Sequence, residues 1–298
     1  MKQKLKGSAL LLLATVIWGN AFVAQSVGMD YIGPFTFQTI RCALAVIFLA
    51  PVTFLFECKQ SSFSASCRRW RDPKLWKAGI ICGCALFMAT SLQQIGLIYT
   101  DAGKSGFLTA MYIVLVPIFG VFIGRKPPKA AVFSVILAVI GLYFLSFVGL
   151  SGIQLGDLAL IGCAVAFAVQ ILCIDRFAGA LDGLRLNCVQ ALTVAVISVP
   201  FMLLTEKVVF WNILDCWLPL AFAGVLSMGV AYSLQITGQR LLEPTTASLL
   251  MSTESVFAVL GGWLLLQETM TKWEILGCVL ILGAVLISQL PEKRKAGS

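Results

Sequence analysis

The stretch Ser91-Leu92-Gln93-Gln94-Ile95-Gly96 occurs again, 142 residues later, as Ser233-Leu234-Gln235-Ile236-Thr237-Gly238. The register continues without a gap from residues 91–146 to residues 233–288, although only nine of these 56 positions are identical. Apolar runs and charged breaks nevertheless coincide along the whole alignment. A duplicated and strongly apolar chain is typical of membrane transporters built from internal repeats, so transport is the first hypothesis.

The composition indicates that this chain lies in a lipid bilayer. Of its 298 residues, 59% are hydrophobic and only 12% are charged, whereas soluble domains are roughly one quarter charged. The formal net charge of +8 does not indicate nucleic acid, because the basic residues lie in loops and at the ends of the chain without interleaved aromatic residues. We therefore expect the lipid bilayer as a partner and no nucleic acid.

Several kinds of catalytic or cofactor site are not expected. The chain has no histidine, and its ten cysteines are scattered, mostly inside apolar runs where a free cysteine packs as a small hydrophobe. No glycine-rich phosphate-binding loop precedes a Lys-Ser or Lys-Thr pair, so no ATP-hydrolysing machinery is expected. The sequence thus predicts a protein with no metal, no cofactor and no enzymatic activity.

Glycine, proline and charged clusters divide the chain into ten apolar runs, each near the roughly 20 residues that a helix needs to cross a bilayer. Backbone groups inside a membrane must find their hydrogen bonds within the segment, so these runs are expected to be helices. The predicted fold is an all-α polytopic membrane protein with ten transmembrane helices. The spans are residues 7–27, 34–56, 75–97, 103–124, 130–149, 155–175, 184–204, 217–239, 244–266 and 272–290.

The positions of Lys and Arg orient these spans. With both termini in the cytoplasm, eighteen of the 22 basic residues lie on the cytoplasmic side and three in the outer loops, while Arg41 lies within a span. This bias follows the positive-inside rule and favours a multi-pass membrane protein with both termini in the cytoplasm.

Ten spans divide into two units of five, which we place at residues 1–149 and 150–298. An odd number of spans in each unit turns the second copy upside down in the membrane. The charges agree, since Arg125-Lys126-Pro127-Pro128 falls on the cytoplasmic side and the equivalent Gln267-Glu268-Thr269-Met270 on the outer side. Two inverted five-helix repeats predict a binding site near the membrane midplane, where the halves meet.

Two charged side chains lie inside predicted spans, although a charge at the bilayer centre costs about 2.5–3.5 kcal/mol. Glu254 lies halfway along span 244–266, and the 142-residue offset aligns it with Tyr112, at the middle of span 103–124. Both are candidate substrate ligands facing a central cavity. The alternative is that Glu254 bonds to a neighbouring helix and Tyr112 only fills space.

Arg41 lies in the second span, nearer the outer boundary. It could attract an anionic group such as a carboxylate, or it could hold the second span in place by bonding to helix-end carbonyls or to a carboxylate elsewhere. An ion pair between Arg41 and Glu254 is not expected, because the two residues lie at different depths.

A further set of polar and aromatic side chains lies within the spans. Thr90 and Gln93 share one helical face and align with Tyr232 and Gln235, so these pairs could form symmetric gates or only interhelical hydrogen bonds. Trp18, Asn20, Gln94 and Gln170 carry the same two interpretations. The predicted substrate-binding residues are Glu254, Tyr112, Arg41, Trp18, Asn20, Gln93, Gln170, Tyr232 and Gln235.

Three parts of the sequence resemble a known family. Ile17-Trp18-Gly19-Asn20-Ala21-Phe22-Val23 is similar to the Trp-Gly-x-x-Phe signature of EamA-type transporters in the drug/metabolite transporter superfamily. Arg41 stands where that family usually has an arginine in its second helix. Glu254 and the run Gly262-Trp263-Leu264-Leu265-Leu266-Gln267-Glu268, followed by Gly277 and Gly283, resemble the end of the second EamA repeat.

The resemblance covers nearly the whole chain and implies a ten-helix, two-repeat bundle. Such proteins move small metabolites, often amino acids or related compounds, and commonly outward across a bacterial inner membrane. The first repeat departs from the family at Arg125-Lys126, where many first repeats have a glutamate. This departure weakens the case for a symmetric pair of gating glutamates.

Together these features predict a secondary transporter that exports a small polar or amphipathic metabolite, such as an amino acid, by alternating access around a midplane cavity. Coupling to protons through Glu254 and facilitated diffusion are both open, as are a monomer and a homodimer. A non-transporting sensor or assembly subunit is an alternative that would require a docking domain outside the membrane. A lipid-processing enzyme is another alternative, and it would require clustered catalytic side chains at one interface.

Overall fold

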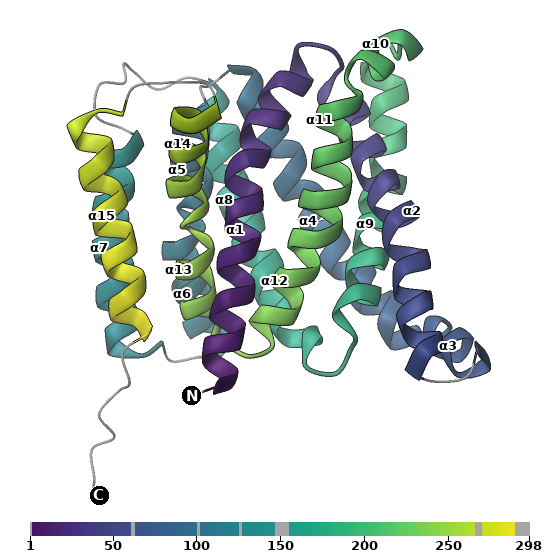
Figure 1. The fold of residues 1–298 in the computed structure, drawn as a ribbon, viewed down its shortest axis with the longest axis horizontal. Helices are drawn as coiled ribbons and strands as arrows, with labels where there is room; N and C mark the ends of the chain where they lie inside the picture. The colour runs from purple at the N-terminus through teal and green to yellow at the C-terminus, as the bar shows by residue number, and fades with distance from the viewer. Residues whose placement is uncertain are drawn as a thin grey trace, which may run out of the picture.

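The computed structural model describes residues 2–60, 63–99, 102–124, 127–146, 155–265 and 270–289. Within these ranges the chain is helical apart from short turns and contains no β-strand. Eight helical segments of the described residues are long and apolar enough to cross a membrane, and a shorter apolar helix covers Lys129–Leu145. Figure 1 shows the long helices standing side by side in one bundle. The prediction of an all-α polytopic membrane protein is confirmed.

The ten predicted spans all coincide with helical residues. The first half contains α1 (Lys2–Met29), α2 (Pro34–Gln60), α3 (Phe63–Trp70), α4 (Pro73–Tyr99), α5 (Ala102–Ala110), α6 (Tyr112–Phe122) and α7 (Lys129–Ser146). The second half contains α8 (Leu155–Ala178), α9 (Gly183–Thr205), α10 (Phe210–Asp215), α11 (Trp217–Ala221), η1 (Phe222–Ala231), α12 (Tyr232–Gln239), α13 (Pro244–Met251), α14 (Glu254–Leu265) and α15 (Lys272–Gln289). The predicted span ends at 147–149, 266 and 290, and the loop residues Arg125-Lys126 and Gln267-Glu268, lie outside the described residues.

The start of α1 and the end of α15 lie on the same face of the bundle, at the bottom of Figure 1. Lys4 Nζ donates a hydrogen bond of 3.2 Å to the carbonyl of Ser288, and the hydroxyl of Ser8 donates one of 3.0 Å to Gln289 Oε1. We call this the terminal face and the other the opposite face. An even number of membrane crossings, as predicted, brings the two ends together in this way.

Helix starts follow from local side-chain chemistry. Asp182 Oδ1 accepts hydrogen bonds of 3.1 Å from the backbone N–H groups of Leu184 and Arg185, and so caps α9. Glu243 caps α13 by accepting from the N–H of Thr246 at 3.1 Å, with a proline at the first helical position. Both caps satisfy donors that the first turn of a helix leaves unpaired.

Spans 103–124 and 244–266 are predicted as single helices, but the structure breaks both near their centres. The first is interrupted at Met111 between α5 and α6, and the second at Ser252-Thr253 between α13 and α14. At the second break, Ser252 donates to the carbonyl of Leu249 at 2.8 Å and Thr253 to that of Leu250 at 2.7 Å. Hydroxyls that bond locally to backbone carbonyls compete with helix continuation.

The helices resume at Tyr112 and Glu254, which are equivalent positions of the two repeats. The breaks are therefore a paired feature of the duplicated fold. Discontinuous helices at membrane depth are tolerated where they are buried in protein or line a cavity, and in transporters they mark binding sites.

Two further segments differ from the sequence-based expectation. Residues 57–74 are predicted as a loop, but α2 continues to Gln60 and the short helix α3 follows. Span 217–239 contains η1, a π-helical stretch of ten residues. The side-chain amide of Asn187 donates to the carbonyls of Met228 and Gly229, both at 2.9 Å, and so satisfies backbone acceptors of this stretch. The equivalent residues of α4 form a regular helix, so the two repeats differ here.

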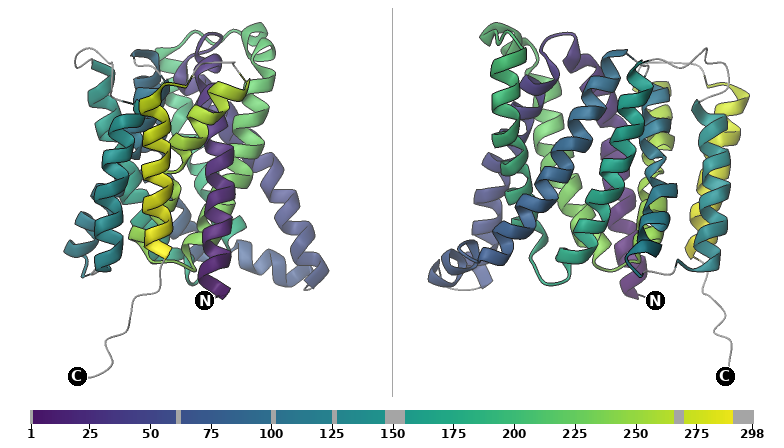
Figure 2. Two further views of the ribbon diagram at one scale, coloured as in Figure 1. Left: turned by 60° about the vertical axis from the view of Figure 1, so that its left-hand side comes forward. Right: turned by 180° about the vertical axis from the view of Figure 1, so that it is seen from behind.

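The halves pack against each other reciprocally. Repeat-equivalent helices pair directly, α2 with α9 and α7 with α15, while α1 packs on α12–α14 and its counterpart α8 packs on α4–α6. The α7–α15 pair stands at one edge of the bundle in Figures 1 and 2. This exchange is the packing that two repeats related by a two-fold axis would have, and the inverted repeat predicted from the sequence would place that axis in the membrane plane.

Candidate substrate cavity

A cavity of about 40 Å³ lies at the centre of the bundle, beside the two helix breaks. Both repeats contribute to its wall, and Arg41 and Glu254 are the two residues of charged type among the lining residues of the described chain. The lining residues are Trp18, Phe22, Gln25, Arg41, Thr90, Gln93, Tyr112, Phe167, Ile171, Ser227, Tyr232, Gln235, Met251 and Glu254. Ligand pockets typically measure roughly 300–1,000 Å³, so this cavity is smaller than a typical ligand pocket.

Tyr112 and Glu254 meet directly across the repeat interface. The hydroxyl of Tyr112 donates a hydrogen bond of 3.2 Å to Glu254 Oε1, and both side chains are buried. Each residue is the first of a helix that resumes after a break, α6 and α14 respectively. A single bond between equivalent positions thus joins the two halves at the predicted midplane.

Arg41 is buried, with 3% of its surface exposed, and its partners are neutral. Its Nε donates to Gln38 Oε1 at 2.9 Å, its Nη1 donates to Gln25 Oε1 at 2.6 Å, and its Nη2 also donates to Gln38 Oε1. Gln38 in turn donates to the hydroxyl of Thr90, which links α1, α2 and α4. In the part of the chain that the structure describes, no carboxylate lies within ion-pair distance of Arg41.

A buried guanidinium whose hydrogen-bond partners are neutral retains a strong preference for an anion. Neutral acceptors satisfy its N–H donors, but they do not compensate for the loss of hydration of the charge. The ring of Phe37 lies below it, with the guanidinium carbon 5.6 Å from the ring centroid, and adds a weak cation–π attraction. An anionic group in the cavity would therefore compensate the charge of Arg41 better than its neutral partners do.

Aromatic side chains and unpaired polar atoms complete the wall. The rings of Trp18 and Tyr232 are in edge contact with centroids 4.9 Å apart, and those of Tyr112 and Phe167 lie 6.2 Å apart. Within the described residues, the indole N–H of Trp18 and the side-chain oxygen of Gln235 are buried without a hydrogen-bond partner. One unpaired donor and one unpaired acceptor are thus present in a wall that mixes polar and apolar side chains.

Seven of the nine predicted site residues line the cavity: Trp18, Arg41, Gln93, Tyr112, Tyr232, Gln235 and Glu254. Gln170 lies behind this wall and accepts a hydrogen bond of 3.4 Å from Gln235 Nε2. The amide of Asn20 instead donates to the carbonyl of Val16 at 2.8 Å, one turn earlier in α1. Substrate binding by all nine residues stays a prediction.

Gln25, Gln38 and Ser227 are polar residues of the site that the sequence analysis did not single out. Gln25 lies seven residues after Trp18, and therefore two turns along the same face of α1, which is a signal that could have identified it. Gln38 lies three residues before Arg41 and shares its face in the same way. Ser227 reaches the cavity from the π-helical stretch, and no periodicity in the sequence indicates that stretch.

The cavity wall contains no obvious cofactor or metal site. Among the described residues, no group of three or more His, Cys, Asp or Glu side chains is close enough to hold a metal ion. The wall can hold a small molecule between one cation, one carboxyl group and aromatic rings.

Comparison with known proteins decides the family. The sequence profile of the EamA-like transporter family matches residues 5–147 and, a second time, residues 154–289. The chain belongs to the EamA-like transporter family. Its members are transporters, which agrees with the expectation that this protein is not an enzyme.

Individual relatives support the same conclusion. A protein of Archaeoglobus fulgidus described as an uncharacterized transporter is 32% identical over 283 residues, which cover 94% of this chain and 84% of that protein. The threonine/homoserine exporter RhtA of Salmonella typhimurium is 33% identical over 223 residues, covering 68% of this chain and 74% of the exporter. RhtA of Escherichia coli K12 is 28% identical over 293 residues, covering 96% and 92% of the two chains.

The fold of this EamA transporter also occurs in a solved crystal structure. The two superpose with a TM-score of 0.79 over 95% of this chain and 96% of the other, at 19% sequence identity. At that identity the likeness concerns the fold alone. The conclusion from the sequence and the comparisons is a multi-pass membrane transporter of the drug/metabolite transporter superfamily.

Proposed function

We propose that this transporter exports a small zwitterionic metabolite, an amino acid or a close relative, by alternating access around the central cavity. The observation that carries the proposal is Arg41, a buried guanidinium in the cavity wall whose partners are the neutral side chains of Gln25 and Gln38. A substrate carboxylate would supply the missing counter-charge and can accept two parallel hydrogen bonds from a guanidinium.

The remainder of the wall suits the other parts of such a molecule. Glu254 is the acidic lining residue and could receive the ammonium group, displacing its bond from Tyr112. Trp18, Tyr232 and Phe167 provide apolar surface for a short side chain. Two relatives named threonine/homoserine exporters agree with this substrate class and with outward transport.

The proposal includes the orientation in the membrane. Eighteen of the 22 basic residues lie on the side of the termini in the predicted topology, so we place the terminal face in the cytoplasm of a bacterial inner membrane. Substrate would then reach the cavity from the terminal face and leave at the opposite face. Rocking of one repeat against the other would open the cavity to each side in turn.

Transport into proteoliposomes tests the substrate class. The protein is supplied with labelled threonine or homoserine, with the corresponding amino alcohol, which lacks the carboxylate, and with a hydroxy acid, which lacks the amine. We expect uptake of the amino acids only. Arg41→Gln should raise KM for the amino acids by roughly 30-fold or more, because removing one partner of a buried charge pair costs about 2–5 kcal/mol. Equal transport of the amino alcohol by the unmodified protein would overturn the carboxylate assignment.

A matched variant separates this effect from the loss of any arginine. Arg240 is exposed at the end of α12, so Arg240→Gln removes the same charge outside the cavity and should leave KM unchanged. Arg41→Lys keeps the charge but loses the two-pronged geometry, and we expect an intermediate KM.

If transport is coupled to protons, we propose that Glu254 is the group that binds and releases the proton. Imposing a pH gradient across the proteoliposomes should then accelerate transport by the unmodified protein but not by Glu254→Gln. If the gradient has no effect on the unmodified protein, the transporter is a facilitator, and the substrate proposal is unaffected.

A further inference from the structure

A groove of about 500 Å³ opens on the terminal face between α2 and α3, far from the central cavity. We call it the α2–α3 groove. It is lined by Ala50, Pro51, Phe54, Cys67, Trp70 and Arg71. Helix α3 lies across the terminal face at the edge of the bundle away from α7 and α15 (Figures 1 and 2), where a membrane surface would be.

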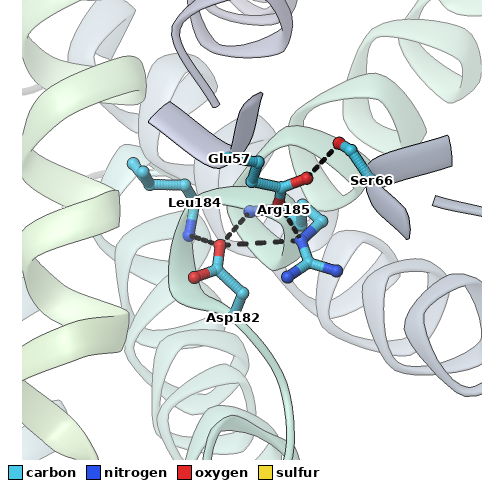
Figure 3. Close-up of polar contacts among 5 residues, drawn as sticks. All are labelled: Glu57, Ser66, Asp182, Leu184 and Arg185. Carbon is cyan, nitrogen blue, oxygen red and sulfur yellow. Dashed lines mark hydrogen bonds and ion pairs between the residues drawn. The ribbon is translucent and has the colours of Figure 1, made fainter. Parts of the chain in front are cut away.

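Polar contacts hold α3 in position, so the groove is a built feature. Glu57, near the end of α2, pairs with Arg185 of α9 through Oε1 and Nε at 2.6 Å and accepts a hydrogen bond from the hydroxyl of Ser66 in α3. Figure 3 shows these three side chains converging at the start of α9, next to Asp182. At the other end of α3, the indole N–H of Trp76 donates to the carbonyl of Trp70 at 2.8 Å.

The stretch of chain that bounds the groove is strongly basic, and we call it the rim. Arg71 lines the groove, and the exposed residues Arg68, Arg69, Lys74 and Lys77 lie within six positions of it in the sequence. The two nearest acidic residues are already engaged, Glu57 with Arg185 and Asp72 with the backbone N–H of Lys74 at 2.9 Å. An anion at this rim would meet several cations and few competing carboxylates.

The floor of the groove is apolar. Five of its six lining residues lack a charge, and the neighbouring Leu55 and Phe56 of α2 are 63% and 58% exposed. Such an apolar floor contributes nothing to the binding of a soluble anion, whereas a lipid acyl chain can pack against it. Pro51, which lies inside α2, is one of these lining residues.

We propose that the α2–α3 groove binds one anionic phospholipid of the membrane leaflet on the terminal face. The acyl chain would lie against Pro51, Phe54 and Trp70, and the phosphate would bond to the arginines of the rim. This site does not depend on the substrate of the central cavity or on the direction of transport.

Native mass spectrometry of the purified full-length protein tests the site, with phosphatidylglycerol and phosphatidylcholine of identical acyl chains as probes. We expect phosphatidylglycerol to bind at least tenfold more tightly. The triple variant Arg68→Ala, Arg69→Ala, Arg71→Ala should lose this preference, since each basic side chain near an anionic lipid surface contributes roughly fivefold. The matched control is Lys2→Ala, Lys6→Ala, Lys129→Ala, which removes three exposed charges elsewhere and should keep the preference.

A second variant addresses the acyl chain. Ala50→Phe fills the groove while leaving every charge in place, and it should weaken phosphatidylglycerol binding at least fivefold. Glycerol 3-phosphate, which carries the anion without the chain, should not compete at millimolar concentration. Unchanged melting temperatures of the variants exclude misfolding as the cause.

Two results would overturn the proposal. If both triple variants lose phosphatidylglycerol equally, the preference is a general charge effect with no site at α3. If glycerol 3-phosphate competes fully and Ala50→Phe binds lipid normally, the groove does not hold an acyl chain.

Discussion

Tyr112 and Glu254 connect the two repeats through one hydrogen bond of 3.2 Å between side chains at equivalent positions. Since both side chains are buried, neither can exchange this bond for one to bulk water without a rearrangement of the cavity. A substrate that binds to Glu254 would have to break it. The bond is thus a direct link between occupancy of the cavity and the contact between the halves.

A double-mutant cycle measures this link. Tyr112→Phe, Glu254→Leu and the combined variant are compared by their free energies of unfolding in mixed micelles. The two effects should be non-additive by about 0.6–1.7 kcal/mol, which are the average and the maximum for interhelical hydrogen bonds in membranes. Tyr99→Phe, at a 57% exposed tyrosine, is the control and should add independently to Glu254→Leu. Additive effects at Tyr112 would mean that the bond contributes nothing to the contact between the halves.

Glu206 joins two connections on the opposite face. Its carboxylate accepts hydrogen bonds from the backbone N–H groups of Phe35 and Thr36, at 2.7 and 2.8 Å, and from the hydroxyl of Thr36 at 2.6 Å. The end of α9 therefore caps the start of α2, its counterpart in the other repeat. A carboxylate at a helix N-terminus also interacts favourably with the helix dipole.

Glu206→Gln removes the charge and one acceptor oxygen while keeping the size. We expect the free energy of unfolding to fall by about 1 kcal/mol, the usual effect of losing a helix cap. Asp215→Asn, at an exposed acid on the same face, should change it by less than about 0.5 kcal/mol. A loss of the same size in both variants would point to surface charge instead of the cap.

At the scale of helices, pairing depends on how closely the backbones approach. In α7 and α15, a Cβ atom at Gly277 would lie 2.6 Å from the carbonyl oxygen of Gly141, which leaves no room for any side chain. In lipid no hydrophobic driving force brings helices together. Small residues at such crossings stabilise the pair because they allow close van der Waals packing. Gly283, on the same helix α15, has no atom within 4 Å of its Cβ position.

These two glycines form a matched pair for a test. Gly277→Ala should lower the free energy of unfolding by about 1–3 kcal/mol, because an added methyl group forces the helices apart. Gly283→Ala gains helix propensity without a clash, so stability should be unchanged or slightly higher. Equal stability of the two variants would contradict the close α7–α15 contact.

At the scale of the whole molecule, the two halves meet around a cavity of about 40 Å³. They pack against each other reciprocally, α1 on α12–α14 and α8 on α4–α6. In the proposed alternating-access cycle, opening one of these interfaces while the other stays packed would expose the cavity to one side only. An inverted repeat would in this way supply two states from one architecture.

The orientation of the whole bundle is tested by labelling cysteines in intact cells. In a cysteine-free background, Lys207→Cys on the opposite face should react with a membrane-impermeant maleimide added outside. Arg240→Cys on the terminal face should react only after the membrane is permeabilised. The reverse pattern would place the termini outside the cell.

Much of the site was predictable from the sequence because charge and polarity are rare inside apolar spans. Arg41 and Glu254 stand out for that reason, and the repeat offset identifies Tyr112. Asn20, which was predicted to bind substrate, and Gln25, which was not, show where prediction from the sequence fails. Both lie in α1, but the rotation of that helix turns Gln25 into the cavity wall and leaves the amide of Asn20 bonded to its own helix.

The sequence by itself determined the membrane class, the approximate spans, the duplication and the equivalence of Tyr112 and Glu254 in the two repeats, since hydropathy and register are properties read along the chain. The tertiary structure decided the hydrogen bond between these two residues, the helix breaks at Met111 and Ser252-Thr253, the π-helical stretch, and the neutral partners of Arg41. Those features depend on helix rotation and on the distance between helices. Contacts between segments far apart in the chain set both quantities, and no local pattern encodes them.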